Sequence, residues 1–152
     1  MAPATGGRYP SDAASIPIAL AGTDVDGTVV SVTVTTLPPA TQGVLYLAGG
    51  VTPVVAGTPI TAAEAATLVF VPAANFNGTV TIPFTVTDNE GNVSAPANEA
   101  ITVNNVQEPP TATPSTSSGD EDTDIPVALA GTDIDGTVVS VTVTTLPPAT
   151  QG

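Results

Sequence analysis

The sequence contains one long segment that occurs twice almost unchanged. Residues 16–43 and 125–152 differ only at Ile18/Val127 and Val25/Ile134, and their starting points lie 109 residues apart. Self-similarity at a fixed period is the signature of tandem repeats, in which each repeat folds as one structural module. The sequence therefore predicts one complete repeat followed by the start of a second.

Proline-rich and acidic stretches set the predicted boundaries between these parts. We expect an N-terminal segment over residues 1–15, a complete repeat over 16–108, a Pro/Ser/Thr linker over 109–119 and the start of an incomplete second repeat over 120–152. Two successive prolines, Pro109 and Pro110, stiffen the junction, although the Ser/Thr-rich stretch is also compatible with a flexible or glycosylated linker. A piece of about 40 residues is too short to bury a core by itself. The second copy therefore either belongs to a longer array or pairs with another chain.

The charge balance excludes several classes of function. The 152 residues include 14 acidic residues and one basic residue, Arg8, with no His and no Cys, for a formal net charge of −13. Without His, Cys or Lys the chain cannot form a Ser-His-Asp or Cys-His nucleophile system, a Schiff base or a Cys/His zinc site. A strongly negative chain repels nucleic acid and anionic lipid, so divalent cations are its expected partners. We expect no enzyme activity, no signal peptide at the N-terminus and no membrane insertion, since no apolar run reaches about 18 residues.

Alternating valines predict half-buried β-strands at residues 28–36 and 79–88. The residues expected to face inward are Val30, Val32 and Val34 in the first segment and Val80, Ile82, Phe84 and Val86 in the second. Because Pro83 lacks a backbone N–H, it predicts an edge strand or a bulge at that point.

Further strands are predicted at residues 16–21, 44–47, 68–71 and 100–106. Thr61 and Glu64 fit a capping box that starts a single helical turn. About seven short strands with turn signals between them are typical of an antiparallel β-sandwich, with the three phenylalanines Phe70, Phe76 and Phe84 as its bulky core residues.

The acidic residues gather in turns between the predicted strands. Asp24-x-Asp26-Gly27, its copy Asp133-x-Asp135-Gly136 and the run Asp88-Asn89-Glu90-Gly91 are the clearest examples. Hard oxygen ligands on loops are what Ca²⁺ binds, although Asp-Gly and Asp-Asn are also ordinary turn formers. An EF-hand is excluded because the twelfth residue from Asp24 is Thr35, where that motif needs a bidentate Glu.

The order of these motifs resembles a known family. GTDVDGT, FVPAANFNGTVTIPFTVTDNEGNVS and a strand ending in VNNVQEPP are similar to the cadherin-like (tandem-95 type) repeats of giant bacterial surface proteins and adhesins. The resemblance implies a seven-stranded Greek-key Ig/cadherin-like sandwich in a tandem array, with Ca²⁺ at the junctions between repeats. Its metal-site residues map onto Asp24, Asp26, Asp88, Glu108, Glu121, Asp133 and Asp135. The first repeat departs from the pattern because residues 11–15 lack most of the acidic cluster found at 120–124.

These observations favour an extracellular structural or adhesive module that extends a bacterial surface or secreted protein and is rigidified by Ca²⁺. Its expected partners are adjacent repeats of the same or neighbouring chains, with any cell-surface or polysaccharide ligand bound through other domains. One alternative is a subunit of a self-assembling filament, completed by strand exchange between neighbouring chains. A second alternative is a carbohydrate-binding module, for which only Tyr9 and Tyr46 offer aromatic platforms outside the predicted core.

Overall fold

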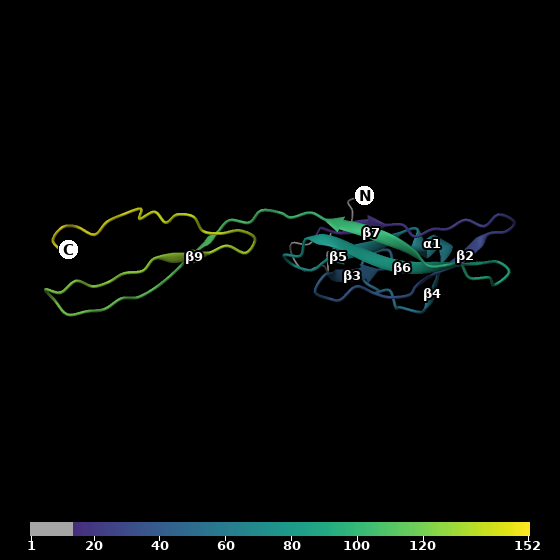
Figure 1. The fold of residues 1–152 in the computed structure, drawn as a ribbon, viewed down its shortest axis with the longest axis horizontal. Helices are drawn as coiled ribbons and strands as arrows, with labels where there is room; N and C mark the ends of the chain where they lie inside the picture. The colour runs from purple at the N-terminus through teal and green to yellow at the C-terminus, as the bar shows by residue number, and fades with distance from the viewer. Residues whose placement is uncertain (1–13) are drawn as a thin grey trace, which may run out of the picture. The chain divides into compact units, whose positions relative to one another are not determined.

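The computed structural model describes residues 14–152 (Figure 1). Its contacts divide the chain into two compact units, Met1–Asn105 and Val106–Gly152. The finer boundaries predicted from the sequence, a repeat over 16–108 and a linker over 109–119, stay predictions. Tyr9 and Arg8 lie outside the described residues.

Seven strands and one helical turn form the described part of the first unit. They are β1 (Ile16–Ile18), β2 (Val29–Val34), β3 (Gly43–Tyr46), β4 (Pro59–Thr61), α1 (Ala62–Ala65), β5 (Leu68–Pro72), β6 (Gly78–Asp88) and β7 (Ala97–Val103). The strands pair antiparallel in two sheets, with the orders β1-β5-β3 and β4-β2-β6-β7. Strands β1 to β6 alternate between the two sheets, so most neighbours within a sheet are not consecutive in the chain.

The two sheets share one hydrophobic core, which confirms the predicted β-sandwich. Leu45, Leu68 and Phe70 of one sheet belong to the same buried cluster as Val32 and Ile82 of the other. Phe70 and Phe84 are buried, and Phe76 packs against the cluster while partly exposed. Burying this apolar surface is the main favourable contribution to folding.

Strand β2 differs from its prediction at one position. Val32 and Val34 are buried as expected, but Val30 is 46% exposed. The pairing of β2 with β6 shifts register between Val29 and Ser31, so the alternation is interrupted there. A bulge of this kind redirects side chains and cannot be read from the pattern of valines.

Pro83 does not mark an edge strand or a bulge. Strand β6 is central, between β2 and β7, and its pairing with β7 runs without a register shift through Pro83↔Asn98. The Pro83 carbonyl accepts a hydrogen bond from the Thr35 N–H, at 3.0 Å, one residue beyond the end of β2. The side of Pro83 that lacks a donor therefore faces the position where the ladder with β2 ends, which is why a proline is tolerated in a central strand.

The predicted capping box is present at α1. The Thr61 hydroxyl accepts the Glu64 N–H, and the Glu64 carboxylate accepts the Thr61 N–H at 2.9 Å. The adjoining strand β4 was not predicted, because three residues starting with a proline carry no alternation.

The second unit has little regular structure. Strands β8 (Thr111–Thr113) and β9 (Ala130–Thr132) pair antiparallel, and neither was predicted from the sequence. In the part of the chain that the structure describes, no helix is long and apolar enough to cross a membrane.

Candidate functional site

Two acidic loops of the first unit meet where β2 begins and β6 ends. The β1–β2 loop carries Asp24, and the β6–β7 loop follows Asp88, the last residue of β6. Thr28 and Asn89 join the loops through two hydrogen bonds: the Thr28 N–H donates to the Asn89 side-chain oxygen at 2.8 Å, and the Asn89 N–H donates to the Thr28 carbonyl at 2.9 Å. The ladder between β2 and β6 thus continues into a fixed contact between the loops.

Gly27 lies where these loops approach each other closely. A Cβ atom at this position would collide with the Asn89 side-chain oxygen and would lie 2.6 Å from a carboxylate oxygen of Asp24. Asp24 is itself held in a turn, because its Oδ1 accepts the Asp26 N–H at 3.4 Å. The Gly of the Asp-x-Asp-Gly sequence therefore serves the packing of the loops.

Asp88 organises the β6–β7 loop. Its Oδ1 accepts the N–H groups of Glu90 and Asn92 at 2.8 and 2.9 Å, and its Oδ2 accepts the Asn92 side-chain amide at 2.9 Å. These bonds favour the ionised form, so they lower the pKa of Asp88 below its ordinary value, with the Asn92 side chain making the largest contribution. The carboxylate thus stabilises a tight turn.

Asp24 and Asp88 line one pocket of about 180 Å³, together with Thr23, Val29, Val86, Asn92, Val93 and Ser94. Two carboxylates, an amide and two hydroxyl groups give this pocket the oxygen chemistry that Ca²⁺ binds. Three N–H donors already bond to the Asp88 carboxylate, however. Asp24 is the only other charged side chain that lines this pocket. The donor set fits a weak cation site rather than a tight one.

The second unit repeats the turn and adds the linker residues. Asp133 Oδ1 accepts the Asp135 N–H at 3.2 Å. Asp135 Oδ2 accepts the Gln107 side-chain amide at 3.1 Å and the Glu108 N–H at 3.3 Å. The structure thus brings the Glu108 backbone beside Asp135, so the predicted linker residue contacts the acidic turn.

The predicted metal ligands are only partly brought together. Asp24 and Asp88 share a pocket, Asp133 and Asp135 share a turn, and Glu108 reaches that turn through its backbone N–H. The side chains of Asp26 and Glu121 make no hydrogen bond in the described part of the chain and do not line the pocket of Asp24 and Asp88. Among residues 14–152, no group of three or more acidic, His or Cys side chains could hold a metal ion.

The sequence reasoning missed Asn89 and Asn92. Asn89 holds the two loops together, and Asn92 binds both oxygens of Asp88. The signal that could have found them is the run Asp88-Asn89-Glu90-Gly91-Asn92, because Asn side chains commonly bond to backbone in turns.

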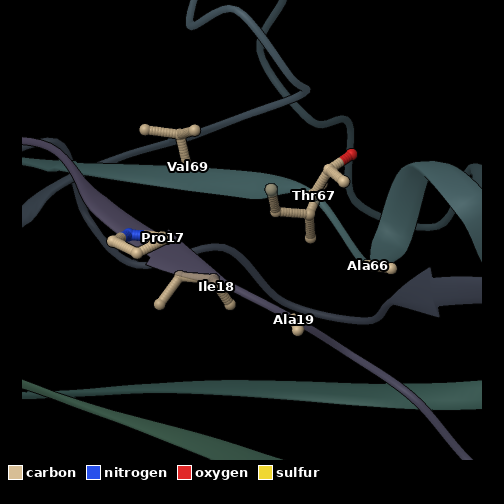
Figure 2. A pocket seen from close by; sticks show the side chains of 7 residues that line it. Pro17, Ile18, Ala19, Ala66, Thr67 and Val69 are labelled. Carbon is tan, nitrogen blue, oxygen red and sulfur yellow. The ribbon is translucent and has the colours of Figure 1, made fainter.

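A second pocket, of about 350 Å³, lies along β1 and the start of β5. It is lined by Pro17, Ile18, Ala19, Ala66, Thr67, Leu68 and Val69, as Figure 2 shows. Its walls are apolar apart from the Thr67 hydroxyl and backbone groups. The lining side chains therefore include no acid or base that could activate the Thr67 hydroxyl as a nucleophile.

Comparison with known proteins adds one finding. A family model described as bacterial Ig domain matches residues 3–104. No curated protein and no solved structure matches the sequence.

Proposed function

The chain belongs to the bacterial Ig domain family, and from this premise we propose that it is a structural repeat module that extends a surface or secreted protein of a bacterium. The family is typically surface-exposed and typically non-enzymatic. The observation that carries the proposal is the repeat itself: a segment that forms β1 and β2 of the sandwich recurs 109 residues later with two changes. A chain that repeats whole sandwiches gains length with each copy.

The junction between repeats supports a role as a spacer. Pro109 and Pro110 fix two successive φ angles and follow Gln107 and Glu108, which bond to Asp135. These bonds lie within the second unit, and we propose that the two prolines stiffen the chain that joins successive repeats.

Small-angle X-ray scattering of the full chain tests the spacer role. We expect replacing both Pro109 and Pro110 with glycine to lower the mean maximum dimension, because glycine-rich segments behave as flexible coils. The matched control replaces another Pro-Pro pair of the second unit, Pro147 and Pro148, with glycine and should leave the dimension nearly unchanged. Equal dimensions for the native chain and both variants would count against a stiff junction.

We further propose that the module binds calcium. Asp24 and Asp88 would hold the ion in the pocket they share, and the excess of acidic residues supplies the attraction. Bound calcium would neutralise the repulsion between these loops. Extracellular modules bind Ca²⁺ with dissociation constants of about 10⁻⁴ to 10⁻³ M, which matches the small charge of this pocket.

Thermal unfolding in calcium and in EDTA tests this part. Ligand at about 100 times its dissociation constant stabilises the folded state by about 2.7 kcal/mol, and each kcal/mol raises the Tm of a domain of this size by about 4–8 °C. We expect 10 mM calcium to raise the Tm of the native chain and to have little effect on Asp24→Asn. The control Glu99→Gln removes a charge from β7, away from the pocket, and should keep the response. A calcium response that Asp24→Asn leaves intact would assign the ion elsewhere.

The carbohydrate-binding alternative has no specific support. Tyr46 lies in β3 with its side chain half-buried, and it lines neither pocket. The strand-exchange alternative stays a prediction.

A further inference from the structure

The chain contains two Asp-Gly dipeptides, and both lie in the acidic turn of the repeated segment. They are Asp26-Gly27 and Asp135-Gly136. Their flanking residues are the same except that Val25 of the first copy is Ile134 in the second. An aspartate followed by glycine is prone to spontaneous isomerisation, because glycine has no side chain to hinder attack by its backbone nitrogen on the preceding carboxyl group. The two sites therefore share one intrinsic reactivity, and a difference between them in the folded chain comes from the fold.

The reacting groups of the first site are not held by other bonds. The Asp26 side chain is exposed and makes no hydrogen bond among residues 14–152, and within the same residues the Gly27 N–H donates none. Only the backbone of Asp26 is fixed, through its N–H, which donates to Asp24 Oδ1 at 3.4 Å. The Asp26 carboxyl group can therefore rotate until its Cγ meets the Gly27 nitrogen without breaking a hydrogen bond.

The second site is held in place by two donors. Asp135 is half-buried, and its Oδ2 accepts the Gln107 side-chain amide at 3.1 Å and the Glu108 N–H at 3.3 Å. Both donors belong to the same compact unit as Asp135. These bonds must break before the carboxyl group can turn towards the Gly136 nitrogen, so they raise the barrier to the reaction.

The Asn-Gly dipeptide of the chain, Asn77-Gly78, is also engaged by the fold. Such a pair reacts by the same route with loss of ammonia. The Asn77 side-chain amide donates to the Asn105 side-chain oxygen at 3.3 Å, and Gly78 is the first residue of β6, where it pairs with Val103. The structure thus distinguishes Asp26 from both of the other candidate sites.

We infer that Asp26 is a site of spontaneous isomerisation to isoaspartate and that Asp135 is protected from it. The Gly27 nitrogen loses its proton and bonds to Asp26 Cγ, and one carboxyl oxygen leaves as water, which closes a five-membered succinimide ring. Water then opens the ring. Attack at Cγ restores aspartate, whereas attack at the α-carbonyl carbon gives isoaspartate, in which the chain runs through Cβ and Cγ. Water is the only co-reactant, and no atom is oxidised or reduced.

The product changes the contact between the two loops of the first unit. Isoaspartate adds one backbone atom directly before Gly27, where an added Cβ would already collide with the Asn89 side-chain oxygen. The longer backbone therefore displaces Gly27, and we expect it to disrupt the two hydrogen bonds between Thr28 and Asn89. This inference requires neither calcium nor a location on the cell surface.

Incubation of the folded full chain in oxygen-18 water with EDTA tests the inference. Each passage through the succinimide exchanges one carboxyl oxygen for a solvent oxygen, and fragmentation mass spectrometry locates the label. We expect Asp26 to be labelled at least about fivefold faster than Asp135, which corresponds to a barrier difference of about 1 kcal/mol, the net contribution of one hydrogen bond. In concentrated urea the two sites should be labelled at equal rates, because their flanking sequences match.

Two substitutions connect the rates to the named groups. Gln107→Ala removes one donor to Asp135 and should accelerate labelling there. The matched control Gln151→Ala changes another glutamine of the second unit, whose backbone N–H bonds to Pro148, and should leave the rate at Asp135 unchanged. Asp26→Glu lengthens the side chain, so that a larger and slower ring closure would be needed, and should abolish labelling at position 26.

Hydrogen exchange measures the structural consequence. In the isoaspartate fraction, separated by chromatography, we expect faster exchange at the Thr28 and Asn89 amides than in the fresh chain. Unchanged exchange would overturn the predicted disruption of the loop contact. Equal labelling of Asp26 and Asp135 in the folded chain, faster labelling of Asp135, or no label at Asp26 would overturn the inference itself.

Discussion

Asp88 shows how one carboxylate serves two purposes in this fold. Its two oxygens accept three N–H donors of the β6–β7 loop, and the side chain also lines the pocket shared with Asp24. A carboxylate that binds this many donors is stabilised in its ionised form. The turn is therefore coupled to the protonation of a single group.

This coupling predicts a pH dependence of stability. The folded-state pKa of Asp88 is lowered, so its contribution is present above the unfolded-state pKa and is lost as the pH falls through the folded value. We expect Asp88→Asn to lower the Tm at neutral pH and to flatten the decline of Tm below about pH 4. Thermal unfolding between pH 2 and pH 7 measures both effects.

The matched control is Glu90→Gln, which removes the same charge from the same loop. The Glu90 side chain makes no hydrogen bond in the described part of the chain, so we expect the acid decline to remain steep. An acid decline that Asp88→Asn leaves unchanged would show that the three donors do not depend on the charge.

At the level of single residues, the sequence indicates some parts of the candidate site and not others. The sequence indicates Asp24 and Asp88 as candidate ligands. Asp24 precedes one predicted strand, Asp88 ends another, and both lie beside turn-forming residues. The role of Asn89 could not be predicted, because its bond to Thr28 depends on which loops meet in space, whereas Asn92 bonds to Asp88 within its own loop. The side chains of Asp26 and Glu121, which belong to similar acidic runs, make no hydrogen bond in the described part of the chain, and their residue types alone do not distinguish them from Asp24 and Asp88.

The strands follow from the sequence where side chains alternate without interruption. In β6, Val80, Ile82 and Phe84 are buried as their period of two predicts. In β2 the register shift at Val29 exposes Val30, and a backbone irregularity of this kind leaves no mark on the pattern of residue types. Periodicity thus predicts strands, while their pairing and edges depend on tertiary structure, as the central position of Pro83 also shows.

The repeated segment gives a matched pair for testing burial. We expect Leu20→Ala to destabilise the first unit by about 2–5 kcal/mol, because it removes a fully buried side chain and leaves a cavity. The same change at its counterpart, Leu129→Ala, should alter stability by less than about 0.5 kcal/mol, since Leu129 is 52% exposed. Urea denaturation of the two full-length variants measures the difference. Equal losses would mean that both segments are buried in solution.

The whole molecule combines a sandwich with a second copy of the segment that starts it. Membership of the bacterial Ig domain family and the period of 109 residues both describe a chain assembled from modules in series. The sequence itself indicates this organisation, because the near-identity of two segments does not depend on knowing the fold, and the domain boundaries stay a prediction. It could not predict β8 and β9, whose three-residue strands lie in a Ser/Thr/Pro stretch and in a turn region with no alternation.

The most direct test of the structural role is to stretch the full chain between its ends with an atomic force microscope or optical tweezers. A spacer built from a β-sandwich must resist extension until its strands separate together. We predict one unfolding event, with a gain in contour length on the order of 300 Å for the residues from β1 to β7. A smooth extension without a discrete event, or a series of short steps, would contradict the account of residues 14–105 as one mechanically cooperative module.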